Sequence, residues 1–256
     1  MWCPRERAVW NAESPDSEME LWPEIQTDEN VFLYSDSRSK LMGSRFFTTR
    51  QTGFVNASEL QSLIRCRAVT KMGIGDYHLR RLALGLPEGH GEAACDFLHQ
   101  PIPLECNLEL LEGVSFSKGC YLGQELTAKT HHTGVVRKRL VPVVLGSTVH
   151  AAKNRALALR HEPERASSIM LEYNKGERAE WKNGLKVGST LTILDNGVDV
   201  GQVTSLADGL GMAKLRTDMV FSQGGDLGKA LVPGDGGNTA VIPWKPNWFP
   251  GHEGAM

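Results

Sequence analysis

A cysteine flanked by glycines is the residue of this chain best suited to chemistry. Cys120 lies between Gly119 and Gly123, at a predicted junction between a loop and a helix. Glycine allows unusual backbone dihedral angles and lets a partner approach closely. The positive end of the helix dipole, with Lys118 and Lys129 nearby, is predicted to favour the thiolate form of Cys120. A thiolate is the form that binds a soft metal or an iron–sulfur cluster.

The same residue types also permit a purely structural interpretation. A lone cysteine is usually a buried apolar residue, and residue types alone favour that alternative for Cys120. Tyr121 is expected to pack beside the loop. Gln124 and Glu125 are expected to begin the helix and so orient the cysteine, although Glu125 could instead pair with Lys129 one helical turn later.

Bulk properties narrow the function classes. The chain has 256 residues, 41% of them hydrophobic, and a net charge of −2, which is ordinary for a globular protein and gives no sign of general nucleic-acid binding. No apolar run reaches the roughly 18 residues of a membrane helix. The five cysteines are widely spaced without a CxxC pair, so we expect free thiols in a reducing compartment.

The first 30 residues are expected to be a divergent acidic leader. No Lys or Arg occurs between Ala8 and Ser37, whereas a mitochondrial presequence is rich in arginine, so none is visible in this chain. Ordered structure is expected from Val31, with a hairpin formed by residues 31–34 and 45–49. Helices are predicted after a cap at Asn56 or Ser58 and over 76–84, the second ending at Gly85.

The second half of the sequence reads as a β unit. Residues 134–146 predict a long strand, and residues 150–180 are polar and are expected to be an excursion or linker. Short β-prone segments follow after Trp181, with an Asn-Gly turn signal at 196–197. The aromatic and proline-rich tail at 243–250 is expected to dock on a small antiparallel barrel. The fold class is therefore α+β, with an α+β unit over 31–135 and a β-barrel over 136–256.

The segment around Cys120 carries a family resemblance. Residues 118–125 read Lys-Gly-Cys-Tyr-Leu-Gly-Gln-Glu, which resembles the signature of the folate-binding iron–sulfur assembly factors, the YgfZ-type relatives of the GcvT aminomethyltransferase. The eukaryotic, mitochondrial branch is the most similar. Further segments resemble the family at 85–89, 103–108 and 130–140, together with the turn containing Asp36 and Arg38. The resemblance runs over about residues 31–145, and more loosely through the β-rich part.

This resemblance implies a function. Family members have a GcvT-like folate-binding domain followed by a barrel, and act late in the maturation of [4Fe-4S] proteins in the mitochondrial matrix, together with A-type iron–sulfur carriers. It implies that Cys120 is a cluster ligand shared with a partner, or an essential thiol. We expect no turnover in the usual sense. The motif normally lies further from the start, so the folate-type domain is expected to be N-terminally incomplete, which weakens the expectation of tetrahydrofolate binding.

Several neighbours of the motif are secondary candidates. One of His131 and His132 could be a metal ligand, the alternative being a hydrogen-bonding role at the start of the barrel strand. Arg137 and Arg139 share a face of an alternating strand and could contact a partner or an anion, or form a solvated face. Residues expected to support the motif are Lys118, Gly119, Tyr121, Gly123, Gln124 and Glu125.

The remaining cysteines have weaker claims. Cys66 falls in a predicted helix and is expected to be a core residue. Cys95 and Cys106 flank the loop before the motif, but no spacing rule supports either as a second ligand, and Cys3 lies in the leader. Two other functions stay open from the sequence: a folate-dependent one-carbon transferase, by analogy with the aminomethyltransferases, and an inert truncated isoform.

Overall fold

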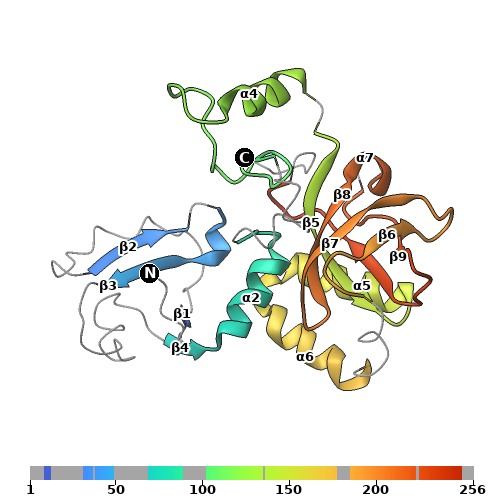
Figure 1. Ribbon diagram of the computed structural model, residues 1–256. Coiled ribbons are helices and arrows are strands. Elements are labelled where there is room, and N and C mark those ends of the chain that lie inside the picture. Colours follow the sequence, from blue (N-terminus) through green and yellow to red (C-terminus); the bar gives the residue numbers. More distant parts are fainter. Residues whose placement is uncertain are drawn as a thin grey trace. The chain divides into compact units, whose positions relative to one another are not determined.

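The computed structural model describes residues 9–12, 31–36, 38–48, 69–88, 102–134, 136–177, 185–222 and 225–249 (Figure 1). The chain divides into two compact units, Met1–Tyr77 and His78–Met256. Within the described ranges, no helix is long and apolar enough to cross a membrane. The helix predicted after Asn56 lies outside them, as do three of the cysteines, namely Cys3, Cys66 and Cys95.

The described residues of the first unit form two small antiparallel strand pairs. Strand β2 (Val31–Ser35) pairs with β3 (Ser44–Thr48), and the short helix η1 (Lys40–Met42) lies between them. This is the hairpin that the sequence predicts. Strand β1 (Val9–Ala12) pairs with β4 (Val69–Met72), so part of the predicted leader is a strand.

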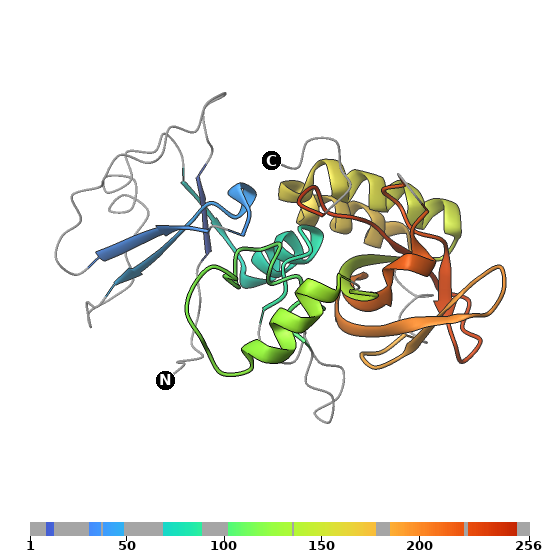
Figure 2. The ribbon, with the colours of Figure 1, turned by 90° about the horizontal axis from the view of Figure 1, so that it is seen from above.

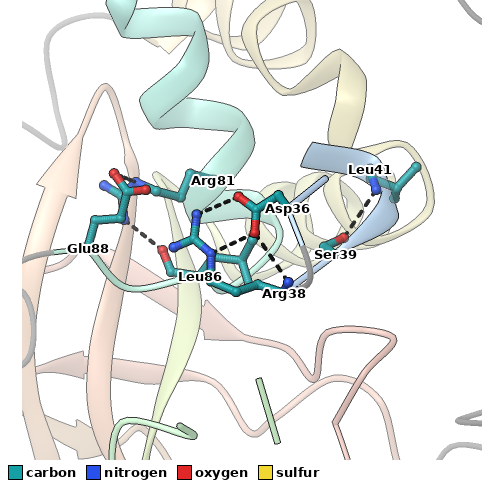
Figure 3. Close-up of polar contacts among 7 residues, drawn as sticks. All are labelled: Asp36, Arg38, Ser39, Leu41, Arg81, Leu86 and Glu88. Atoms are coloured by element: carbon teal, nitrogen blue, oxygen red, sulfur yellow. Dashed lines mark hydrogen bonds and ion pairs between the residues drawn. The ribbon is translucent and has the colours of Figure 1, made fainter. Parts of the chain in front are cut away.

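A carboxylate and a guanidinium close the β2–β3 turn. Asp36 Oδ1 accepts hydrogen bonds from the Arg38 backbone N–H at 3.2 Å and from Nε at 2.9 Å, and Oδ2 accepts one from Nη2 at 2.7 Å (Figure 3). This paired geometry joins two side chains only two residues apart. It links the two charged residues of the predicted turn.

The second unit is built on a closed antiparallel barrel. Its strand order is β10-β5-β8-β7-β6-β9, and closure leaves no sheet edge unpaired. The strands are β5 (Lys138–Gly146), β6 (Thr190–Ile193), β7 (Asp199–Ala207), β8 (Leu210–Arg216), β9 (Leu231–Pro233) and β10 (Ala240–Pro243). The small antiparallel barrel expected from the sequence is confirmed, although the sequence did not indicate β9 and β10 as strands.

From Leu140 onward, strand β5 is apolar because both of its faces are covered. Val141, Val143 and Leu145 belong to one buried cluster, with residues of β6, β7 and β8. Leu140 and Val144 belong to a second cluster, which includes residues of the surrounding helices. An unbroken apolar run is what such a doubly buried strand requires.

The expected polar excursion is helical. Residues 150–180 contain most of α5 (Val149–His161) and all of α6 (Ala166–Glu177), which lie beside the barrel in Figures 1 and 2. The Thr148 hydroxyl caps α5 by accepting the Ala151 N–H at 3.2 Å. An apolar stripe of Ala152, Ala156 and Leu159 is completely buried. The linker interpretation is therefore wrong. The buried stripe consists of small apolar residues, and the many polar residues on the other faces of the helix make the segment polar on average in the sequence.

The barrel unit begins before residue 135. Helix α2 (Ile74–Ala83) matches the prediction of 76–84, and its Leu79 and Leu82 share the second buried cluster with Leu140. Packing of these residues places the division of the chain after Tyr77, whereas the sequence suggested a boundary at 135. Apolar residues on either side of position 135 thus contribute to one core.

The end of α2 meets the C-terminal tail. Gly85 has φ +68°, and a Cβ there would lie 2.6 Å from Pro246, so both conformation and space require glycine. The Trp248 indole N–H donates to the Leu84 carbonyl at 2.8 Å. The tail thus contacts the end of α2 as well as the barrel, whose buried cluster includes Phe249. Arg81 holds the segment after the helix by donating to the Leu86 carbonyl at 2.7 Å (Figure 3).

Candidate thiol site at Cys120

The Cys120 loop leads into helix α4 (Gln124–Thr133). Gly123 precedes the helix with φ +81°, a left-handed conformation that favours glycine. The Gln124 side-chain oxygen accepts the Tyr121 backbone N–H at 3.1 Å, which closes the turn between cysteine and helix. The structure thus places Cys120 at a loop-to-helix junction, and it gives Gln124 a part in starting the helix.

The thiol of Cys120 is accessible. Cys120 is exposed, and the side chain of Leu122 is completely exposed beside it. A Cβ placed at Gly119 or Gly123 would meet no atom within 4 Å, so the space around the loop is open. The structural alternative, a small residue packed in a tight turn, does not describe this cysteine.

An aromatic stack holds the loop against α4. The rings of Phe116 and His131 lie with their centroids 3.8 Å apart and their planes at 23°. His132 meets the edge of His131, with centroids 5.5 Å apart. Stacking gives His131 a packing role that the sequence did not suggest. In the ranges that the structure describes, no group of three or more His, Cys, Asp or Glu residues is arranged to hold a metal ion.

Lys118 and Tyr121 form a second contact within the loop. The Lys118 ammonium lies 5.3 Å from the centroid of the Tyr121 ring, within the range of a cation–π interaction. Tyr121 is half-buried, in agreement with the predicted packing role. The contact keeps a positive charge two residues from Cys120. Glu125 and Lys129 are both exposed on α4.

Arg139 is engaged within the chain. Its Nη1 lies 2.7 Å from Glu109 Oε1, 3.0 Å from the Leu104 carbonyl oxygen and 3.2 Å from Asn107 Oδ1. The side chain is only 14% exposed and is engaged within the chain, whereas the sequence predicted contact with a partner or an anion, or a solvated strand face. Arg137, by contrast, is exposed and keeps the predicted role of partner contact.

Cys106 is excluded as a second cluster ligand by its surroundings. Its side chain belongs to the buried cluster around α2 and β5. Burial, assisted by the neighbouring Glu105 carboxylate, raises the pKa of the Cys106 thiol from 9.0 to about 11. The thiol is therefore protonated at neutral pH and inaccessible, as expected for a structural cysteine.

Taken together, the site offers a single exposed sulfur. The described ranges contain two cysteines, of which Cys120 is exposed and Cys106 is buried. Such a site can donate one thiolate to a soft metal, while further ligands must come from elsewhere. Sequence reasoning missed the Phe116–His131 stack and the contacts of Asn107 and Glu109. The positive φ of 61° at Asn107 reflects a tight turn, for which asparagine at 107 was an available signal.

Comparison with known proteins agrees with the barrel. Residues 137–251 match the family model described as the CAF17 C-terminal β-barrel domain, and this match covers the whole closed barrel. The chain carries a CAF17 barrel. Its first strand, β5, directly follows α4, so the CAF17 barrel anchors the returning end of the Cys120 loop and helix.

Three curated relatives extend the comparison beyond the CAF17 barrel. A protein of Mycosarcoma maydis is 34% identical over 231 residues, which cover 85% of this chain and 53% of that protein. A protein of Aspergillus oryzae is 35% identical over 61% of this chain and 32% of its own length. A protein of Mus musculus is 41% identical over 50% of this chain and 32% of its own length. Each is named a mitochondrial iron–sulfur cluster assembly factor IBA57 or its homologue. The chain thus spans between a third and about half of the length of these relatives.

Proposed function

We propose that this chain is a mitochondrial iron–sulfur cluster assembly factor in which Cys120 supplies one thiolate to a cluster shared with a carrier protein. The observation that carries the proposal is the open, exposed position of Cys120 ahead of α4. The names of the relatives support the assembly role and the mitochondrial location. The late step, in which [4Fe-4S] proteins mature, rests on the resemblance of the motif.

The shared cluster follows from the number of available ligands. Iron–sulfur clusters are usually held by four cysteine thiolates. Cys120 offers one, and Cys106 is buried in its protonated form. Because the described residues offer no second accessible thiol, we infer that a partner supplies the other ligands, and the A-type carriers are the partner class that the resemblance implies. A cluster held by one thiolate on this side can be released without unfolding the site.

The Cys120 loop can perform three tasks in such a transfer. The thiol loses its proton to solvent as sulfur binds iron, and regains one when the cluster leaves. Leu122 and Leu126, two and six residues after Cys120, expose apolar side chains that can exclude water from a bound, labile cluster. The Phe116–His131 stack limits movement of the loop against α4. The cluster is therefore cargo rather than a resident cofactor.

Reconstitution tests the proposal directly. The chain and an A-type carrier are mixed with iron and sulfide, and thiolate-to-iron absorption is recorded. We expect an absorption band for the pair that exceeds the sum of the separate proteins, and Cys120→Ser should remove this excess. Cys106→Ala is the matched control and should keep it. The absence of excess absorption in the wild-type pair would refute ligation by Cys120.

A relocated thiol tests whether position matters. Ser117 is exposed on the same loop, so Ser117→Cys combined with Cys120→Ser keeps one exposed thiol but moves it by three residues. We expect this double variant to stay inactive. Full recovery would mean that any exposed thiol suffices. Tetrahydrofolate binding stays a separate prediction, and calorimetry with tetrahydrofolate tests it on the same samples.

A further inference from the structure

The segment that carries Cys120 leaves and returns at nearly the same place. Residues 110–138, here called the Cys120 excursion, start directly after Glu109 and end directly before Arg139. Arg139 contacts three groups on the outgoing side of this excursion: the Leu104 carbonyl oxygen at 3.0 Å, Asn107 Oδ1 at 3.2 Å and Glu109 Oε1 at 2.7 Å. One guanidinium therefore joins the two ends of a segment of about thirty residues, a span over which closure has a substantial entropic cost.

Asn107 completes the junction from the opposite side. It is completely buried, and its Nδ2 donates to the Leu140 carbonyl at 2.7 Å while its Oδ1 accepts from Arg139. The Leu140 backbone N–H also donates to the Glu105 carbonyl at 2.8 Å. Both ends of the Asn107 amide are thus in use, which orients the side chain and aligns the segment before the excursion with the start of β5.

The junction is largely shielded from water. The side chains of Arg139 and Glu109 are 14% and 11% exposed, and the Phe249 ring lies 6.0 Å from the guanidinium carbon. Glu109 Oε2 is buried and has no hydrogen-bond partner within the described residues, so the carboxylate relies on Arg139. Loss of either partner is costly in such surroundings, because water cannot replace it.

We propose that Arg139 is a positioning residue that fixes the Cys120 excursion at its base and thereby sets where Cys120 is held relative to the barrel. That this position matters for cluster transfer rests on the proposed function; the geometric claim does not. Arg139 contacts Leu104, Asn107 and Glu109 rather than Cys120. It acts through Asn107 and Glu109, which hold the outgoing chain.

Distance measurement by pulsed electron paramagnetic resonance tests the geometric claim. Spin labels are placed on Cys120 and on Lys153→Cys, which is exposed on α5, in a chain whose Cys3, Cys66 and Cys95 are replaced by serine. We expect one narrow distance distribution. Arg139→Gln should broaden it, and Arg139→Lys should restore it in part, since lysine keeps the charge but cannot reach all three acceptors.

A second label pair separates positioning from general stability. Labels at Lys153→Cys and Lys229→Cys, both exposed in the barrel unit, report on the barrel with Cys120 replaced by serine. Their distribution should stay narrow in Arg139→Gln. If this pair broadens as well, Arg139 supports the whole unit and the positioning role is overturned. An unchanged Cys120 distribution in Arg139→Gln would overturn it equally.

The two proposals fail separately in this design. If the wild-type chain shows a narrow distribution but forms no cluster with a carrier, the proposed function is wrong and the positioning role remains. If Arg139→Gln leaves the distribution narrow while the wild-type pair forms a cluster, the positioning role alone is wrong. If both hold, Arg139→Gln should reduce the excess absorption, and Arg139→Lys should recover part of it.

Discussion

Removing either member of the Arg139–Glu109 pair should destabilise the chain by amounts that differ. The atoms are 2.7 Å apart, and each side chain is close to nine-tenths buried. Exposed ion pairs contribute about 0.2–1 kcal/mol, whereas breaking a buried pair costs about 3–5 kcal/mol. Arg139→Met leaves Glu109 and Asn107 without their donor, so we expect a loss of about 3 kcal/mol in the free energy of unfolding. Glu109→Leu leaves the guanidinium with two acceptors and should cost about 1–2 kcal/mol.

The double variant gives the coupling energy. Apolar replacement of both partners removes the unpaired charge, so the double variant should be more stable than the sum of the two single losses predicts, by about 1–2 kcal/mol. Urea unfolding followed by circular dichroism measures all four proteins, with agreement between two probes as the check on two-state behaviour. Strict additivity of the two losses would refute the buried pair, and with it the junction at the base of the Cys120 excursion.

Three further predictions concern the barrel unit. Gly201→Ala should lower the free energy of unfolding by at least about 3 kcal/mol, because Gly201 has φ +147° and a Cβ there would lie 2.0 Å from a carbonyl oxygen of β8. Gly197→Ala is the control: Gly197 has φ +69° but lies in open space, so its loss should be about 1 kcal/mol. Equal losses for the two variants would contradict this reasoning. Because burial raises the pKa of Cys106 from 9.0 to about 11, the stabilisation from its protonated form is complete below pH 9 and is lost towards pH 11. Urea unfolding should show that the free energy of unfolding is lower at pH 10.5 than at pH 8, by at most about 2.7 kcal/mol. Cys106→Ala should not show this decrease. Trp248→Phe removes the hydrogen bond to the Leu84 carbonyl and should lower the free energy of unfolding, measured by thermal unfolding, by about 1 kcal/mol. An unchanged stability would show that this bond does not contribute.

The fold was predictable where local patterns are strong. The Asn-Gly turn and the β-prone segments around it indicate the barrel, and Gly85 marks the end of α2 because it adopts a positive φ. Helix α5 was missed, since its buried stripe contains small alanines among many polar residues. Strands β9 and β10 were missed because they are only three and four residues long and border prolines. Short strands are specified by their partners more than by their own residues.

At the candidate site, too, local features were predictable from the sequence and long-range contacts were not. The glycines around Cys120 indicate an open loop, and that inference needs no long-range contact. Strand alternation predicts which residues share a face with Arg139, but not that Asn107 and Glu109, some thirty positions earlier, would lie against it. Contacts between residues so distant in sequence depend on the assembled barrel. The role of Arg139 therefore became visible only in the structure.

Protection of Cys120 from alkylation tests the central claim most directly. The chain is treated with iodoacetamide alone, with an apo carrier, and with a carrier loaded with an iron–sulfur cluster, and modification of Cys120 is followed by mass spectrometry. The claim predicts rapid modification of the exposed thiol alone and strong protection that requires the loaded carrier. Equal modification rates with apo and loaded carriers would contradict it, because a sulfur bound to iron cannot be alkylated at the rate of a free one.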